Sequence, residues 1–96
     1  MKVIFTKQAE FDLEQILDFI AQDNPIRALS FTQELEQKCL SIADIPKAFQ
    51  IFDELADLGI RRRVYQNYSI FFRIESNCIF IVRILNTAID YTVLYK

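Results

Sequence analysis

Three strand-like runs follow one another almost without interruption in the last third of the chain, at residues 60–66, 68–75 and 78–85. Asn67 separates the first two runs, and Ser76-Asn77 separates the next two. β-Branched and aromatic runs between such turn residues are typical of β-strands. Connections this short join only neighbouring antiparallel strands, because a parallel pair needs a long crossover. The end of the chain therefore predicts an antiparallel sheet.

The first half of the chain predicts two helices that meet at a tight corner. Thr6 suits a helix N-cap, and the apolar residues that recur at helical spacing after it are Ala9, Leu13, Ile16, Leu17 and Ile20. Further along, Asn24 suits a second N-cap and Pro25 the first helical position, where a missing N–H costs nothing. The second apolar stripe is expected to end near Ala43, because Pro46 disfavours helix before it. Two helices joined so closely predict an antiparallel hairpin.

The remaining segments complete an α+β fold in one domain, residues 1–96. Residues 1–5 form a short strand pattern that is expected to join the later three strands. Residues 44–59 look irregular, and the apolar side chains expected to enter the core there are Phe49, Ile51, Phe52 and Leu55. Gly59, the only glycine, is expected to take a positive φ. We therefore expect a helical hairpin packed on a mostly antiparallel four-stranded sheet, followed by a short C-terminal segment, residues 88–96, that is either helical or extended.

The composition excludes several classes of function. The chain has no histidine, which removes Ser/His/Asp and Cys/His nucleophilic sites and ordinary zinc sites. One glycine cannot build a phosphate-binding loop, so no metal or cofactor is expected. Cys39 and Cys78 have no metal-ligand spacing and are expected to be buried, reduced thiols. The longest apolar run, residues 78–82, stops at Arg83 and no signal peptide is evident, so a cytoplasmic protein without a membrane span is expected.

Charge is distributed unevenly along the chain. Residues 1–59 carry five Lys/Arg and eleven Asp/Glu, a net charge of −6, whereas residues 60–96 carry six and two, a net charge of +4. Such asymmetry indicates an anionic or acidic partner for the strand region. The acidic residues of the first helix are expected to form a solvated face; they are Glu10, Asp12, Glu14 and Asp18.

The basic residues of the strand region begin with Arg61, Arg62 and Arg63. The period of two puts Arg61 and Arg63 on one strand face and Arg62 on the other. Guanidinium groups bind phosphate or carboxylate bidentately, so these residues beside Tyr65 are candidates to bind an RNA backbone or an acidic peptide. Alternatively, they solvate a sheet edge or pair with the acidic helices. Four tyrosines are candidates to stack on nucleic-acid bases or to act as acids, or else they pack in the core or in cross-strand pairs; they are Tyr65, Tyr68, Tyr91 and Tyr95.

Arg73 and Arg83 each interrupt a strongly apolar strand. A two-residue loop at Ser76-Asn77 would put them on opposite faces of the sheet, whereas a three-residue loop would put them on the same face. In either case at least one of them is expected to pair with a carboxylate or a partner, because an unpaired buried charge is very costly. We therefore expect both arginines to be partly structural and Arg61 to Arg63 to be exposed.

These residues, in this order, resemble the RelE/ParE superfamily of toxins from bacterial toxin–antitoxin modules. The resemblance covers nearly the whole chain. It rests on Ala9, Asp12-Leu13, Ile16, Asp23-Asn24-Pro25, Ala28, Phe31, Ala43, Pro46, Leu58-Gly59-Ile60-Arg61, Tyr68-Ser69-Ile70-Phe71-Phe72-Arg73, Ile81-Val82-Arg83-Ile84-Leu85 and Asp90.

The ParE-like branch is the better match. It implies a type II toxin that arrests growth by binding a macromolecular target, often DNA gyrase, rather than by chemistry. It also implies a cognate antitoxin whose acidic tail lies along the apolar hairpin and sheet, with arginines as counter-charges. The residues expected to bind partners are Arg61, Arg62, Arg63, Tyr65, Arg73 and Arg83.

Two alternatives stay open. A RelE-like member would be a ribosome-dependent mRNA endoribonuclease, with Arg61, Arg63 and either Tyr91 or Tyr95 as catalytic candidates. Ser69 stands where such relatives carry an arginine. Arginine is also a poor base, and an acidic protein suits a ribosomal target poorly, so mRNA and the ribosome are the less expected partners.

The other alternative is a degenerate, non-toxic member that only binds an antitoxin-like partner. Many ParE-like chains follow the final strand with His-Gly-x-Arg-Asp. Here the same stretch reads Asn86-Thr87-Ala88-Ile89-Asp90, and only the aspartate is retained.

Overall fold

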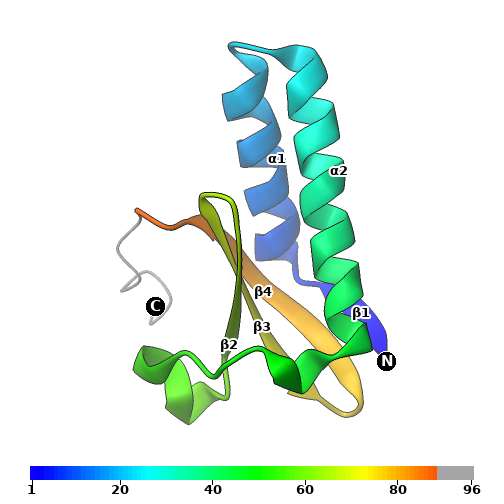
Figure 1. Ribbon diagram of the computed structural model, residues 1–96, viewed down its shortest axis with the longest axis vertical. Helices are drawn as coiled ribbons and strands as arrows, with labels where there is room; N and C mark the ends of the chain where they lie inside the picture. The colour runs from blue at the N-terminus through cyan, green and yellow to red at the C-terminus, as the bar shows by residue number, and fades with distance from the viewer. Residues whose placement is uncertain (89–96) are drawn as a thin grey trace.

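A helical hairpin packs on one face of a four-stranded sheet (Figure 1). The computed structural model describes residues 1–88. The elements follow in the order β1 (Lys2–Phe5), α1 (Lys7–Ala21), α2 (Pro25–Ser41), the 3-10 helices η1 (Ile42–Asp44), η2 (Pro46–Ala48) and η3 (Asp53–Leu58), β2 (Arg61–Tyr65), β3 (Tyr68–Glu75) and β4 (Cys78–Asn86). The expected α+β arrangement is confirmed. The predictions for residues 89–96, with Tyr91 and Tyr95, lie outside the described residues.

Both helices begin where the capping residues predict. The Thr6 hydroxyl accepts a hydrogen bond from the Ala9 N–H at 3.2 Å, and the Asn24 side chain accepts one from the Arg27 N–H at 3.0 Å. Pro25 occupies the first turn of α2. The corner is closed because the Asn24 N–H donates to the Ile20 carbonyl at 2.9 Å. As Figure 1 shows, this end of the hairpin stands clear of the sheet.

The strand order in the sheet is β1-β4-β3-β2, so β1 and β2 are the two edges. β3 is antiparallel to both β2 and β4, as the short loops predict, whereas β1 runs parallel to β4. Ser76 and Asn77 both have positive φ values, 52° and 61°, as a tight hairpin requires. Gly59 has a φ of 67° where the chain turns from η3 into β2, which confirms the expectation for the only glycine.

The β3–β4 ladder contains an irregularity that the sequence argument did not include. Glu75 pairs with Cys78 across a two-residue loop, but the register shifts between Phe71 and Phe72. Phe72 pairs with Ile81 and Phe71 pairs with Arg83, which leaves Val82 as an extra residue. The prediction that a two-residue loop puts Arg73 and Arg83 on opposite faces assumed an unbroken ladder, and this extra residue interrupts the regular alternation of side chains along β4.

The core lies on both faces of the sheet. The larger cluster, between the hairpin and the sheet, includes Ala9, Ile16, Phe31, Leu35, Cys39, Ile42, Tyr68, Ile70, Phe72, Ile79, Ile81 and Ile84. The smaller cluster, on the other face, consists of Leu55, Ile60, Phe71 and Leu85 with Phe52 and Val82 against it. The segment between α2 and β2, residues 42–60, supplies apolar side chains to both clusters. It therefore packs against both faces of the sheet at the β2 edge.

Two expectations about burial need correction. Ile51 is 42% exposed, because it forms an isolated bridge with Arg61 along the outer edge of β2 while Phe49 and Phe52 enter the core. Cys39 is fully buried as expected, whereas Cys78 is only half-buried at the start of β4.

Candidate functional site

Three consecutive arginines form most of β2, the edge strand that lies beside α2. Several polar side chains of α2 reach toward this strand. We define the β2 surface as Arg61, Arg62, Arg63 and Tyr65 of β2 with Arg27, Glu34 and Lys38 of α2. Within residues 1–88 no carboxylate lies within ion-pair distance of the three β2 arginines. The three β2 arginines therefore carry positive charge that no carboxylate of the described residues pairs.

Arg61 and Arg63 point toward the same side, as the period of two predicts, and both donate to backbone carbonyls. Arg61 Nη1 lies 2.7 Å from the Phe49 carbonyl oxygen. Arg63 Nη1 lies 2.9 Å from the Lys38 carbonyl oxygen and 2.8 Å from Ser41 Oγ. The Lys38 carbonyl belongs to the last turn of α2, where carbonyls lack helical partners and a cation is favourable. Both arginines are half-buried rather than exposed, so they hold β2 against its neighbours.

Arg62 points to the opposite side of the strand. Its guanidinium carbon lies 4.9 Å from the centroid of the Phe52 ring, an arrangement that favours a cation over an aromatic face. It is half-buried. Among the described residues the Arg62 guanidinium makes no ion pair or hydrogen bond, whereas those of Arg61 and Arg63 donate to carbonyls, so Arg62 is the β2 arginine whose charge is most available to a partner.

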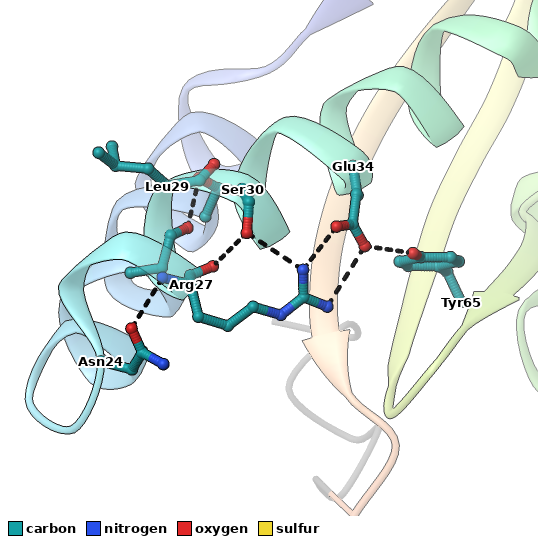
Figure 2. A network of polar contacts seen from close by, with 8 residues as sticks. Asn24, Arg27, Leu29, Ser30, Glu34 and Tyr65 are labelled. Carbon is teal, nitrogen blue, oxygen red and sulfur yellow. Dashed lines mark hydrogen bonds and ion pairs between the residues drawn. The ribbon is translucent and has the colours of Figure 1, made fainter.

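Tyr65 belongs to a polar network with α2 (Figure 2). Its hydroxyl donates to Glu34 Oε1 at 2.6 Å, while Arg27 Nη1 donates to Glu34 Oε2 and to Ser30 Oγ. Figure 2 shows the Glu34 carboxylate between the guanidinium and the phenol. Lys38 Nζ lies 5.4 Å from the centroid of the Tyr65 ring. The phenol is thus fixed from two sides.

This network shifts the pKa values of Glu34 and Tyr65 in opposite directions. Hydrogen bonds from Arg27 and then from Tyr65 lower the pKa of Glu34, because they stabilise its charged form. Donation to Glu34 raises the pKa of Tyr65 above that of a free phenol. At neutral pH Tyr65 stays protonated and Glu34 is a weaker base than usual. Tyr65 was predicted from the sequence, whereas Arg27 and Glu34 were not, although their seven-residue spacing places them on one face of α2.

Arg73 lies on the face of the sheet away from the hairpin. Its Nε donates to Glu75 Oε2 at 2.9 Å, and its guanidinium carbon lies 4.9 Å from the centroid of the Phe80 ring. The same residue lines a groove of about 380 Å³, whose other lining residues are Leu55, Leu58, Ile60, Phe71, Glu75 and Val82. Arg73 is therefore paired locally, on a different side of the molecule from the α2 network.

Arg83 pairs with Asp12 of α1. Arg83 Nε lies 2.8 Å from Asp12 Oδ2, Arg83 Nη2 lies 3.0 Å from Asp12 Oδ1, and the Ile84 N–H also donates to Oδ2 at 2.9 Å. Donation to the Asp12 carboxylate raises the pKa of Arg83, because it stabilises the charged guanidinium. The expected carboxylate partner for an arginine in an apolar strand is thus confirmed.

Asp12 itself corrects the expectation of a solvated acidic face, because it is only 6% exposed. It stands three residues after Ala9 and four before Ile16, both of which are buried, so the helical spacing places Asp12 on the buried face of α1. Glu10, Glu14 and Asp18 are exposed as expected. Ser69 is fully buried, so this position presents no side chain to an RNA.

Two further properties concern the described chain as a whole. Among residues 1–88, no group of three or more metal-ligating side chains is placed to hold a metal ion. In the same part of the chain, none of the helices combines the length and apolar character needed to cross a membrane.

A family model described as the ParE toxin of the type II toxin–antitoxin system, parDE, matches residues 3–91. The chain belongs to the ParE toxin family. A solved structure described as a chromosomal ParDE TA system from P. aeruginosa superposes on this ParE-family chain with a TM-score of 0.79 and 22% identity, covering 90% of this chain and 95% of that one. The superposition confirms the fold. Among curated proteins, no sequence matches.

In this ParE-family chain the candidate residues fall into three groups. Arg61, Arg63 and Arg83 satisfy carbonyl or carboxylate groups of their own chain. Arg62 and Tyr65 lie on the β2 surface, where Arg62 stacks on Phe52 and Tyr65 donates to Glu34. Arg73 lies on the other face of the sheet.

Proposed function

We propose that this ParE-family toxin arrests growth by binding a macromolecular target, with DNA gyrase as the first candidate, and that an acidic antitoxin neutralises it in the cytoplasm. The observation that supports the proposal is that polar side chains of the β2 surface make hydrogen bonds within their own chain. Arg61 and Arg63 donate to backbone carbonyls, and Tyr65 donates to Glu34. These side chains are fixed by their own chain, which favours a preformed binding surface.

The same arrangement argues against catalysis at this surface. Metal-independent RNA cleavage needs a base for the 2′-hydroxyl, a cation for the developing charge and an acid for the leaving oxygen. The only described carboxylate that contacts Tyr65 is Glu34, whose lowered pKa makes it a poor base. Tyr65, with its raised pKa, is a poor acid. Both pKa shifts are unfavourable for acid–base catalysis by Glu34 and Tyr65, whereas binding a partner requires no proton transfer.

An acidic antitoxin fits the charge distribution. The β2 surface contains five cationic side chains against one carboxylate, Glu34, which Arg27 already pairs. Complementary electrostatic potentials on two proteins speed their association and make it selective. An acidic segment bound beside β2 would lie close to Arg62, Lys38 and Arg63, so these three cations would supply its counter-charges.

Two assays of the purified chain, run side by side, test the proposal. One measures DNA supercoiling by gyrase, and the other measures mRNA cleavage on ribosomes, each with and without a molar excess of the antitoxin from the same module. We expect inhibited supercoiling, relief by the antitoxin and intact mRNA. Cleaved mRNA with normal supercoiling would instead identify an endoribonuclease. No effect in either assay would support the non-toxic alternative.

A further inference from the structure

The outer edge of β2 is covered along only part of its length. The Phe52 N–H donates to the Ile60 carbonyl at 2.8 Å, and the Arg62 N–H donates to the Gln50 carbonyl at 3.2 Å. The covering segment leaves the edge before Gln50, because Phe49 turns inward and its ring meets that of Phe72 edge-on at 6.1 Å. The strand continues to Tyr65 without this cover.

Val64 lies in the uncovered part of this edge. Successive residues of a paired strand direct their N–H and C=O groups alternately to the two sides. Since the Arg62 N–H points away from β3, the N–H and C=O of Val64 also do. Within the described chain neither group has a hydrogen-bond partner, and Val64 is 52% exposed. A groove of about 340 Å³ follows the same edge, lined by Gln50, Ile51, Phe52, Asp53, Glu54, Arg62 and Val64.

The charges decide what could occupy this edge. A second copy paired through β2 would bring two runs of three arginines together, and like charges on adjacent strands destabilise the pair. Two carboxylates, Asp53 and Glu54, line the groove, but they follow the segment that already covers Ile60 to Arg62. Around Val64 the neighbouring charged groups of β2 are Arg62 and Arg63. An acidic strand is therefore favoured over a second copy.

We propose that an acidic, extended segment of the antitoxin adds to the sheet beside Val64 as a fifth strand. This inference rests on the proposed function, because it locates the contact by which the antitoxin binds. Backbone hydrogen bonds from the N–H and C=O of Val64 would supply affinity, as in other cases of strand addition. Alternate side chains of the added strand would face Arg63 and Lys38 on one side of the sheet and Arg62 on the other. A strand with acidic residues at alternate positions fits this pattern.

The test compares Val64→Pro with Val64→Thr in binding to the full-length antitoxin, measured by calorimetry. Proline removes only an N–H that points away from β3, a position where edge strands tolerate it, whereas threonine keeps both the N–H and the branched shape. We expect dissociation constants about tenfold higher for Val64→Pro and within about twofold of the wild type for Val64→Thr, the former corresponding to loss of a backbone hydrogen bond. Circular dichroism establishes that each variant is folded.

A second measurement on the wild-type chain does not depend on folding of the proline variant. Exchange of the Val64 amide hydrogen should slow at least about tenfold when the antitoxin binds, because the N–H acquires a partner. Antitoxin binding with equal affinity for Val64→Pro, or with unchanged exchange at Val64, would overturn the strand addition and leave the proposed function intact. Absence of any complex with the wild-type chain would instead contradict the proposed function.

Discussion

The Asp12 carboxylate closes the part of the β4 edge that β1 leaves open, by accepting hydrogen bonds from Arg83 and from the backbone of Ile84. β1 pairs with β4 only as far as Ile81, and Thr6 extends this cover by donating to the carbonyls of Ile81 and Val82. Asp12 takes the next position along the edge. A single carboxylate thus joins α1 to the sheet at the point where the ladder is irregular.

Asp12→Ala should destabilise the protein by about 2 to 4 kcal/mol, because it leaves a partly buried guanidinium and a buried N–H without their acceptor. Asp18→Ala is the matched control, since Asp18 lies on the exposed side of the same helix and should cost less than about 0.5 kcal/mol. Urea denaturation followed by circular dichroism measures both values. Equal stability of the two variants would show that the Asp12 pair contributes nothing.

The stability contributed by Glu34 should depend on pH. Its pKa is lowered in the folded protein, so the contribution is fully present above the unfolded value of about 4.3 and is lost as pH falls through the folded value. The difference in unfolding free energy between the wild type and Glu34→Gln should therefore shrink on acidification from neutral pH to about pH 3. Glu36→Gln is the control, because Glu36 makes no ion pair among residues 1–88. A difference that stays constant over this range would contradict the network.

Arg62→Glu should weaken antitoxin binding about tenfold, mainly by slowing association, because it reverses a charge beside the open edge. Lys47→Glu makes the same change in net charge at an exposed position in η2, outside the β2 surface. Surface plasmon resonance at two salt concentrations measures both variants. The deficit of Arg62→Glu should decrease at high salt as its charge is screened. Equal losses for the two variants would mean that only net charge matters.

The two thiols should differ in reactivity. Burial raises the pKa of Cys39 to about 12, and only the thiolate reacts readily. Cys78 is half-buried. Mass spectrometry of the folded protein after brief maleimide treatment near neutral pH should find one label, on Cys78, whereas unfolded protein should carry two. Rapid labelling of Cys39 in the folded protein would show that the hairpin does not pack on the sheet as described.

Features governed by local chemistry were predictable from the sequence. Thr6, Asn24 with Pro25, and Gly59 act through their own side chains or backbone freedom, so the helix starts and the turn into β2 followed directly. Ser76-Asn77 likewise determined the hairpin. The family assignment was predictable for a related reason, since many such local signals occur in a fixed order.

Features that depend on contacts between distant segments were not predictable. The extra residue at Val82 interrupts the alternation of side chains along β4, and no local signal in the sequence shows it. Asp12 is buried because β4 offers it three donors, which its helix sequence alone does not show. For the same reason, two hydrogen bonds could not be predicted: the one from Arg61 to the Phe49 carbonyl and the one from Arg63 to the Lys38 carbonyl of α2.

The most direct test of the account is growth after induced expression of the chain, alone and together with its antitoxin. Viable counts should fall sharply when the chain is expressed alone and should recover when the antitoxin is co-expressed, because the antitoxin is proposed to bind the toxin and neutralise it. The amount of soluble, folded chain is measured in the same cultures. Full viability at a high soluble level of the chain alone would contradict the assignment of toxicity.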